Sequence, residues 1–233
     1  MINKKSQQGA TLVIVLLVML LIIIIGTLAV RQSLVSLNIA TNSQAQQLMF
    51  ENSDTALFRV EDPAQVEKQL ATNGMFAYFD SADHKDDELV FCYKGSNTNF
   101  FSLQNASVIS ADGTLTKNGI SGYCQATSFT SGRSAILSQV YLNLINTTSQ
   151  PLVNLTVGTS AGVSNNIPNA TKRITVTVIS VLPSFSSAST TQIQNCFKAR
   201  QSAVGACFEG LNIPYNLQRA DYTVGATQSL KTS

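Results

Sequence analysis

The amino-acid sequence predicts an α+β protein, in which a long N-terminal α-helix with a transmembrane first half precedes a domain built on an antiparallel β-sheet. Three observations lead to this prediction. Residues 12–30 are almost continuously apolar. No Pro or Gly interrupts the chain between Thr27 and Asp62. Beyond that point, segments of alternating apolar and polar residues are separated by turn-forming residues, which is typical of strands joined by hairpins.

The apolar run at residues 12–30, LVIVLLVMLLIIIIGTLAV, contains no charged residue. As a helix it would span roughly 28 Å, close to the bilayer's hydrocarbon thickness of about 30 Å. It is longer than the apolar region of a cleaved secretory signal, which has about 7–15 residues. Lys4 and Lys5 precede the run and Arg31 follows it. We therefore expect the first residues in the cytoplasm and the remainder of the chain across the membrane.

The helix is predicted to continue beyond the membrane segment. Apolar residues recur there at three- and four-residue steps among Gln, Asn and Ser, and include Leu34, Leu37 and Ala56. We predict one helix over residues 10–60, with the transmembrane part at about 11–30. Asp62-Pro63 then supplies a cap and a first helical residue for a short helix predicted to end near Asn73.

Residues 61–233 are predicted to form one α+β domain. Strands are expected at residues 88–93, 100–109, 136–145, 152–157 and 172–182. Asp112-Gly113 is a dipeptide typical of hairpin turns. A further helix is expected at 190–200, and residues 158–170 and 183–191 are expected to be loops.

Four cysteines form an even set, which suits disulfides in a domain outside the cytoplasm. Three pairings are open, and order along the chain favours Cys92–Cys124 and Cys196–Cys207. A zinc site is the functional alternative. Neither the cysteine spacing nor a nearby histidine supports it, because His84 is the single histidine.

Acidic residues gather between positions 80 and 88. Carboxylate oxygens could hold Ca²⁺, but the spacing is not that of an EF-hand. A solvated loop between two strands is the favoured interpretation. The acidic residues of this segment are Asp80, Asp83, Asp86, Asp87 and Glu88.

Composition and motifs indicate that the chain is not an enzyme and has no cofactor. Sequences of the forms GxGxxG, GxSxG and Walker A do not occur. The formal net charge of +2 does not favour direct binding of nucleic acid. Charged residues make up 12% of the chain, and this low content suits an extracytoplasmic, β-rich domain.

The N-terminus resembles a known family. A short basic stretch, MINKKSQQ, ends in Gly9, and the apolar run begins almost at once with Ala10-Thr11-Leu12. This arrangement resembles the class III signal of type IV pilins, which prepilin peptidase cuts after the Gly. The stretches QQGATLVIVLLVML and GTLAVRQSLVSLNIATNSQAQQ are similar to the PilX group of minor pilins. The resemblance covers about the first 60 residues.

The resemblance implies a set of processing steps and a fold. Residues 1–9 would be a leader, cleavage would fall between Gly9 and Ala10, and Ala10 would be N-methylated. The mature chain would have 233 − 9 = 224 residues. A type IV pilin-like fold would pack the long helix, through its C-terminal half, on the antiparallel sheet. Pilins often end in a disulfide-bonded loop, which fits a Cys196–Cys207 pair.

The chain departs from the major pilins at one position. They carry Glu at mature position five, where it is thought to pair with the N-terminal amine of a neighbouring subunit. Here that position is Ile14, and no acidic residue occurs between Ala10 and Phe50. Either the chain is not a pilin, or it occupies the filament tip. At the tip there is no subunit above whose N-terminal amine needs to be neutralised. The tip is favoured, because the K minor pseudopilin of type II secretion also lacks this Glu.

The function expected from the resemblance is that of a minor pilin that helps to initiate type IV pilus assembly, for adhesion, twitching motility or DNA uptake. The chain would lie in the bacterial inner membrane with a periplasmic C-terminal domain, and then in the pilus. Its partners would be prepilin peptidase, other minor pilins, the major pilin and a tip adhesin. The rival interpretations are a type II secretion pseudopilin and a membrane-anchored periplasmic binding protein.

Overall fold

The structure is a computed structural model, which describes residues 8–62, 65, 68–69, 71, 73–96, 102–125, 136–145 and 172–224. The chain divides into two compact units, residues 1–45 and 46–233. The predicted strand at 152–157 and the loop at 158–170 lie outside the described residues. So does most of the helix predicted from Pro63 to Asn73, although Gln65, Lys68 and Gln69 are helical.

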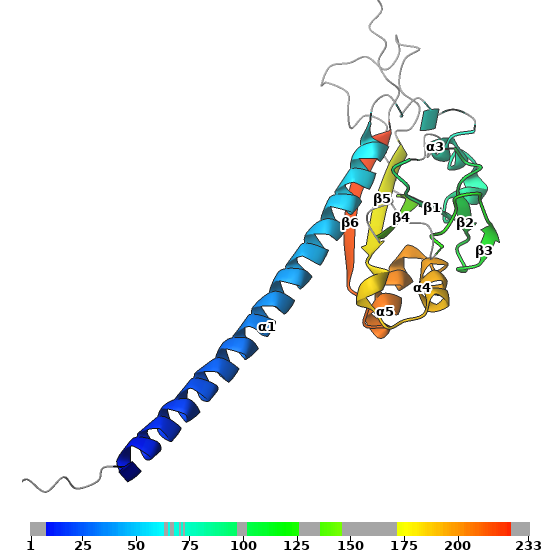
Figure 1. Cartoon of the computed structure of the whole chain (residues 1–233). Coiled ribbons are helices and arrows are strands. Elements are labelled where there is room, and N and C mark those ends of the chain that lie inside the picture. The colour runs from blue at the N-terminus through cyan, green and yellow to red at the C-terminus, as the bar shows by residue number, and fades with distance from the viewer. Residues whose placement is uncertain are drawn as a thin grey trace, which may run out of the picture. The chain divides into compact units, whose positions relative to one another are not determined.

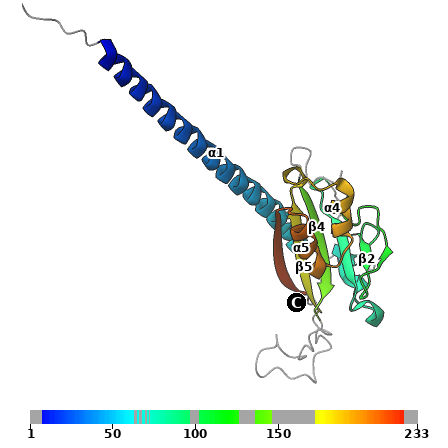
Figure 2. The same cartoon turned by 90° about the horizontal axis from the view of Figure 1, so that it is seen from below.

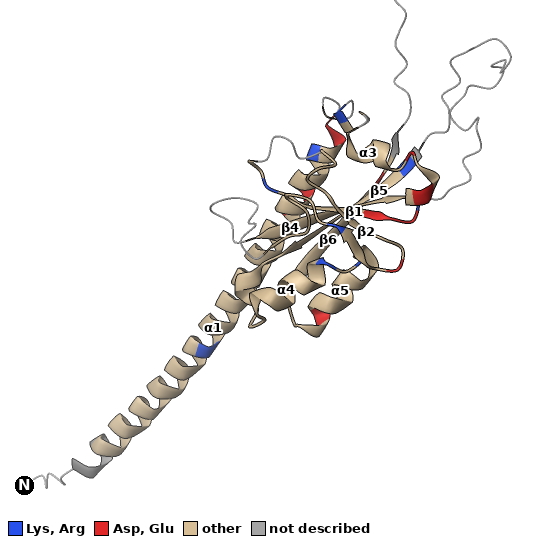
Figure 3. Cartoon of the chain, turned by 90° about the vertical axis from the view of Figure 1, so that its right-hand side faces the viewer, with Lys and Arg blue, Asp and Glu red and all other residues tan. Residues whose placement is uncertain are grey.

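Helix α1 (Gln8–Glu61) begins and ends close to the predicted bounds of 10–60. No Pro interrupts it, and Gly26, its one Gly beyond Gly9, is tolerated within a membrane-type helix. Among the described residues, this is the one helix long and apolar enough to cross a membrane. Figure 3 shows the first part of α1 almost without charge, and Arg31 is the single charged residue between Gln8 and Phe50.

The second unit is built on a six-stranded sheet with the order β3-β2-β1-β4-β5-β6, in which every neighbouring pair is antiparallel. β1 and β4 are the two middle strands, and β4 pairs with β5 in unbroken register, from Leu137 opposite Val181 to Leu144 opposite Ile174. Figure 1 shows β3 and β6 at opposite edges. The strands are β1 (Glu88–Cys92), β2 (Ser107–Ile109), β3 (Leu115–Lys117), β4 (Leu137–Leu144), β5 (Lys172–Val181) and β6 (Tyr215–Val224).

One face of the sheet packs against residues 46–61 of α1. Ala56, Leu57 and Val60 share a buried cluster with alternate residues of the central strands, such as Val140 and Val176. Val140, Leu142 and Leu144 of the strand predicted at 136–145 lie on one face, because all three contribute to this cluster. The C-terminal part of the helix is thereby fixed to the sheet by apolar burial, which is worth roughly 25 cal/mol per Å².

The other face is covered by α4 (Thr190–Phe197) and α5 (Gln201–Gly210) (Figures 1 and 2). Phe197 and Phe208 pack edge to face, with ring centroids 5.1 Å apart, above Tyr141 and Ile179. Ser189 begins α4 with a capping box, in which its side chain accepts from the Gln192 amide and the Gln192 side chain accepts from the Ser189 amide. Both faces of the sheet are therefore buried.

Several predicted bounds need correction. The helix expected at 190–200 ends at Phe197, and Arg200 adopts an extended conformation that starts α5 instead. The segment 183–191 is not wholly a loop, because Pro183–Phe185 forms a 3₁₀ turn and α4 begins at Thr190. The strand expected at 100–109 is limited to β2 within the described residues. Strand β3, strand β6 and helix α5 were not predicted. The remaining short elements are α3 (Met75–Tyr78) and a 3₁₀ turn at Ala82–His84.

Candidate functional site

In the first unit, residues 8–45 belong to one uninterrupted helix. Gly9 and Ala10 are the second and third residues of α1, and Ile14 lies just after them with its side chain 61% exposed. The large apolar residues between Leu12 and Val30 are all exposed in the same way. Such a surface is unfavourable in water and requires lipid or other apolar helices around it.

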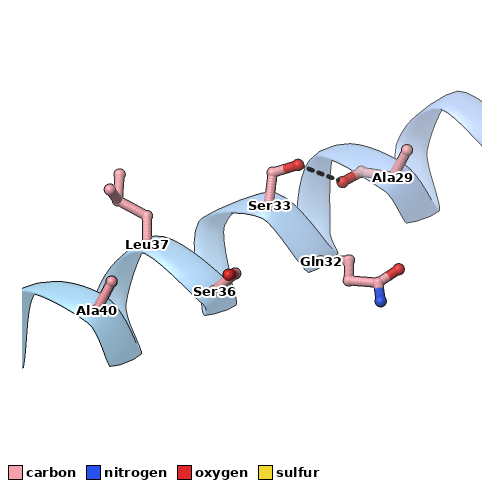
Figure 4. Close-up of a pocket in the computed structure, with 6 residues that line it drawn as sticks. All are labelled: Ala29, Gln32, Ser33, Ser36, Leu37 and Ala40. Carbon is pink, nitrogen blue, oxygen red and sulfur yellow. Dashed lines mark hydrogen bonds between the residues drawn. The ribbon is translucent and has the colours of Figure 1, made fainter. Parts of the chain in front are cut away.

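A shallow groove on α1 begins at the end of the apolar run, and four of its six lining side chains are Ala or Ser (Figure 4). Ser33 donates its hydroxyl to the Ala29 carbonyl at 2.9 Å, and Thr41 donates to the Leu37 carbonyl at 3.0 Å, so these hydroxyls are satisfied within the helix. Small residues at three- and four-residue spacing allow a second helix to approach closely. The residues of the groove are Ala29, Gln32, Ser33, Ser36, Leu37 and Ala40.

In the second unit, polar contacts fix the remaining part of α1 to the sheet. The buried Ser53 hydroxyl donates to the Ser180 hydroxyl at 2.7 Å, and Ser180 also contacts Ser138 at 2.7 Å. Tyr222 on β6 donates to the Glu61 carboxylate at 2.8 Å. Burial, and then this hydrogen bond, raises the pKa of Tyr222 well above its ordinary value. The helix therefore cannot rotate or slide on the sheet without losing specific partners.

The two disulfides lie on the face of the sheet opposite α1. The structure pairs Cys92 with Cys124 and Cys196 with Cys207, as order along the chain favours. The first bond ties β1 to the chain after β3, and the second ties α4 to α5. Cys92, Cys124 and Cys196 are buried, and the described residues contain no free cysteine.

The acidic segment 80–88 differs from the expected solvated loop between two strands. It follows α3 rather than a strand, and its last member, Glu88, is buried in β1. Glu88 forms an ion pair with Arg200 at 3.2 Å, and it accepts from the Asn143 side chain and from the Gln201 amide that begins α5. Glu88 therefore joins the sheet to the start of α5.

Asp87 is a second acid of this segment with defined side-chain contacts. It accepts from the Tyr78 hydroxyl at 2.6 Å and lies 3.2 Å from His84, whose ring stacks on Tyr78. Burial, followed by the hydrogen bond to Asp87, raises the pKa of Tyr78 above its ordinary value. Within the described part of the chain, no three His, Cys, Asp or Glu side chains gather in a way that could hold a metal ion.

The candidate site is therefore the exposed apolar surface of α1 from Leu12 to Val30, which includes Ile14. Gly9 and Ala10 belong to the same helix, whereas the four cysteines lie in the second unit. Sequence reasoning missed the pair of Glu88 and Arg200, because the two residues are far apart in the chain and neither carries a local signal. No protein-family profile, no curated protein and no solved structure matches this chain.

Proposed function

We propose that this chain is a minor pilin of the PilX type, which prepilin peptidase cleaves between Gly9 and Ala10 and which helps to initiate a type IV pilus. The observation that carries the proposal is the uncharged helical segment that follows directly on Gly9. A short basic leader precedes it, and the same helix continues into a sheet domain with two disulfides. Such a chain has one end suited to lipid or a helical bundle and the other suited to the periplasm.

The mechanism of assembly follows from these two ends. Before assembly, lipid solvates the apolar residues of the helix. In a filament, the corresponding helices of other minor pilins and of the major pilin replace the lipid, and the small-residue groove permits close contact. The domain contributes surfaces for partners, including a tip adhesin, and takes no part in chemistry.

Ile14 supports a position at the tip. A carboxylate at this depth would be costly in the membrane unless a neighbouring amine neutralised it. A subunit with Ile there cannot pair with the amine of a subunit above it. We therefore propose that the chain lies at the filament tip, with no subunit above it.

Two experiments test the proposal in the bacterium that carries the gene. A deletion strain should assemble few or no pili, and the wild-type chain should restore them. A Gly9→Val variant, whose branched side chain obstructs access of the peptidase to the backbone, should accumulate in the membrane and fail to restore pili. Full restoration by that variant would refute the proposal. Immunogold labelling should mark filament ends, and even labelling along the shaft would refute the tip position alone.

A further inference from the structure

Residues 117–124, here called the Ile120 loop, present an apolar side chain to solvent. Ile120 is 84% exposed, the highest value among the exposed large hydrophobic residues of the described chain. One exposed isoleucine is unremarkable in itself. What distinguishes this residue is the manner in which the chain holds it.

The Ile120 loop is fixed on both sides of its tip. A Cβ at Gly119 would lie 2.4 Å from the Ala106 carbonyl oxygen, and a Cβ at Gly122 would lie 1.8 Å from the Ser107 hydroxyl. Only glycine fits at such close approaches. The fully buried Ser107 hydroxyl also accepts from the Gly119 and Tyr123 amides, both at 3.3 Å.

Backbone contacts complete the attachment of the loop. The Ile120 amide donates to the Gln104 carbonyl at 3.2 Å, and the Ser121 carbonyl accepts from the Cys92 amide at 3.0 Å. The Cys92–Cys124 disulfide closes the segment. Ile120 therefore cannot withdraw into the core, and its exposure is a property of the fold.

Two lysines accompany Ile120, and neither contacts a carboxylate within the described chain. Lys117 donates to the Leu103 carbonyl at 3.1 Å. Lys198 lies 5.3 Å from the centre of the Tyr123 ring and contacts the Asn195 side chain. The surface is an apolar tip with positive charge beside it, and it suits a partner surface that is apolar and acidic.

The same chain carries such a surface on residues 46–61 of α1. Phe50 and Phe58 are 49% and 70% exposed, and Asp54 lies between them at a spacing of four residues. Residues with this spacing share one side of a helix. Glu51 is exposed as well. We call Phe50, Glu51, Asp54 and Phe58 the aromatic helix face.

The two surfaces lie at opposite edges of the sheet. The Ile120 loop follows the edge strand β3, whereas the aromatic helix face adjoins the other edge strand, because Gln218 of β6 donates to the Phe50 carbonyl. A contact between two different surfaces is heterologous, so it leaves one surface of each kind open on the pair. Anchoring in one membrane brings two copies side by side.

We propose that the Ile120 loop of one copy docks on the aromatic helix face of a second copy, with Ile120 between the two phenylalanines and a lysine beside Asp54. The contact is small, so it is weak in dilute solution and forms where both copies share a membrane. The inference does not depend on entry into a filament, because it requires only two anchored copies side by side.

Photo-crosslinking in intact cells tests this contact. The full-length chain carries p-benzoylphenylalanine in place of Phe58, and ultraviolet light should give an adduct at twice the mass of the chain. Mass spectrometry should locate the bond in residues 117–124 of the second copy. The same probe at Phe185, which is exposed elsewhere on the domain, should give no bond to that loop. The proposal would be overturned if the probe at Phe58 bonded only to another protein or to lipid. A bond to a second copy outside residues 117–124 would overturn it as well.

Variants test the chemistry of the contact. Ile120→Ser, Lys117→Glu and Asp54→Lys should each lower the adduct at least five-fold, whereas Lys117→Glu combined with Asp54→Lys should restore it. All three positions are exposed, so both disulfides should form normally, and non-reducing gels check this. An adduct that is indifferent to Ile120→Ser, or a double variant without recovery, would contradict the proposed contact. Leader cleavage, measured on the same samples, reports separately on the pilin proposal.

Discussion

The buried pair of Glu88 and Arg200 offers the sharpest test of how the domain is held together. The Glu88 side chain is 4% exposed and that of Arg200 is 25% exposed. An Arg200→Met substitution removes the cation but leaves the carboxylate buried. Breaking a buried pair in this way costs about 3 kcal/mol, and the partial exposure of Arg200 favours this lower end of the usual range. Arg200 also donates to the Ser110 carbonyl at 2.7 Å, and this hydrogen bond is lost as well.

The loss should be visible as a shift in urea denaturation of the full-length chain in detergent micelles. With a dependence of about 2 kcal/mol per molar urea, a loss of about 3 kcal/mol lowers the midpoint by about 1.5 M. Circular dichroism of the tyrosines in the near ultraviolet reports on the domain, because α1 dominates the far-ultraviolet signal. The chain has six Tyr and no Trp.

A double variant serves as the control. Glu88→Leu combined with Arg200→Met removes both charges and should recover much of the loss, since a buried ion pair can be replaced by apolar side chains with little cost. A shift of less than about 0.3 M for Arg200→Met alone would mean that the pair behaves like an exposed one, which is worth only about 0–1 kcal/mol. Glu88 would then not be the residue that fixes α5 to the sheet.

Three further predictions concern the same domain and the same assay. A Cys196→Ser/Cys207→Ser variant should lose about 3 kcal/mol, because it frees a short loop in the unfolded chain; an unchanged midpoint would contradict this. Gly122→Ala should cost roughly 1–3 kcal/mol, because its Cβ would meet the Ser107 hydroxyl, whereas Gly210→Ala, with no atom within 4 Å, should cost nothing; equal effects would refute the steric argument. Burial and Glu61 raise the pKa of Tyr222 above 10, so the stability it contributes is present below pH 10 and is lost as the pH rises further; Tyr222→Phe should flatten that decline, and an identical pH profile would contradict it.

The elements with strong apolar patterns could be predicted from the sequence. The long helix was predicted to within a few residues, because its apolar run and the absence of helix breakers are local signals. Strands β1, β4 and β5 were predicted for the same reason, since both faces of the sheet are buried and their apolar residues are dense.

The missed elements lack such a pattern. Strand β6 is at the edge of the sheet and carries Gln218, Arg219 and Asp221, so its residues do not alternate between apolar and polar. Helix α5 contains Gly205, which lowers helix propensity, and it is held by packing of Val204 and Phe208 on the sheet. Tertiary contacts fix these elements, as they fix the pairing of Glu88 with Arg200, and a single sequence carries no signal of such contacts.

The mature N-terminus is the measurement that tests the pilin proposal most directly. Mass spectrometry of the chain from cells with and without prepilin peptidase activity would provide it. The proposal predicts a chain that begins at Ala10, carries one added methyl group and has 233 − 9 = 224 residues, in peptidase-containing cells only. An intact leader in both strains would contradict it. The chain would then be a membrane-anchored domain, and Gly9 and Ile14 would indicate neither leader cleavage nor a position in a filament.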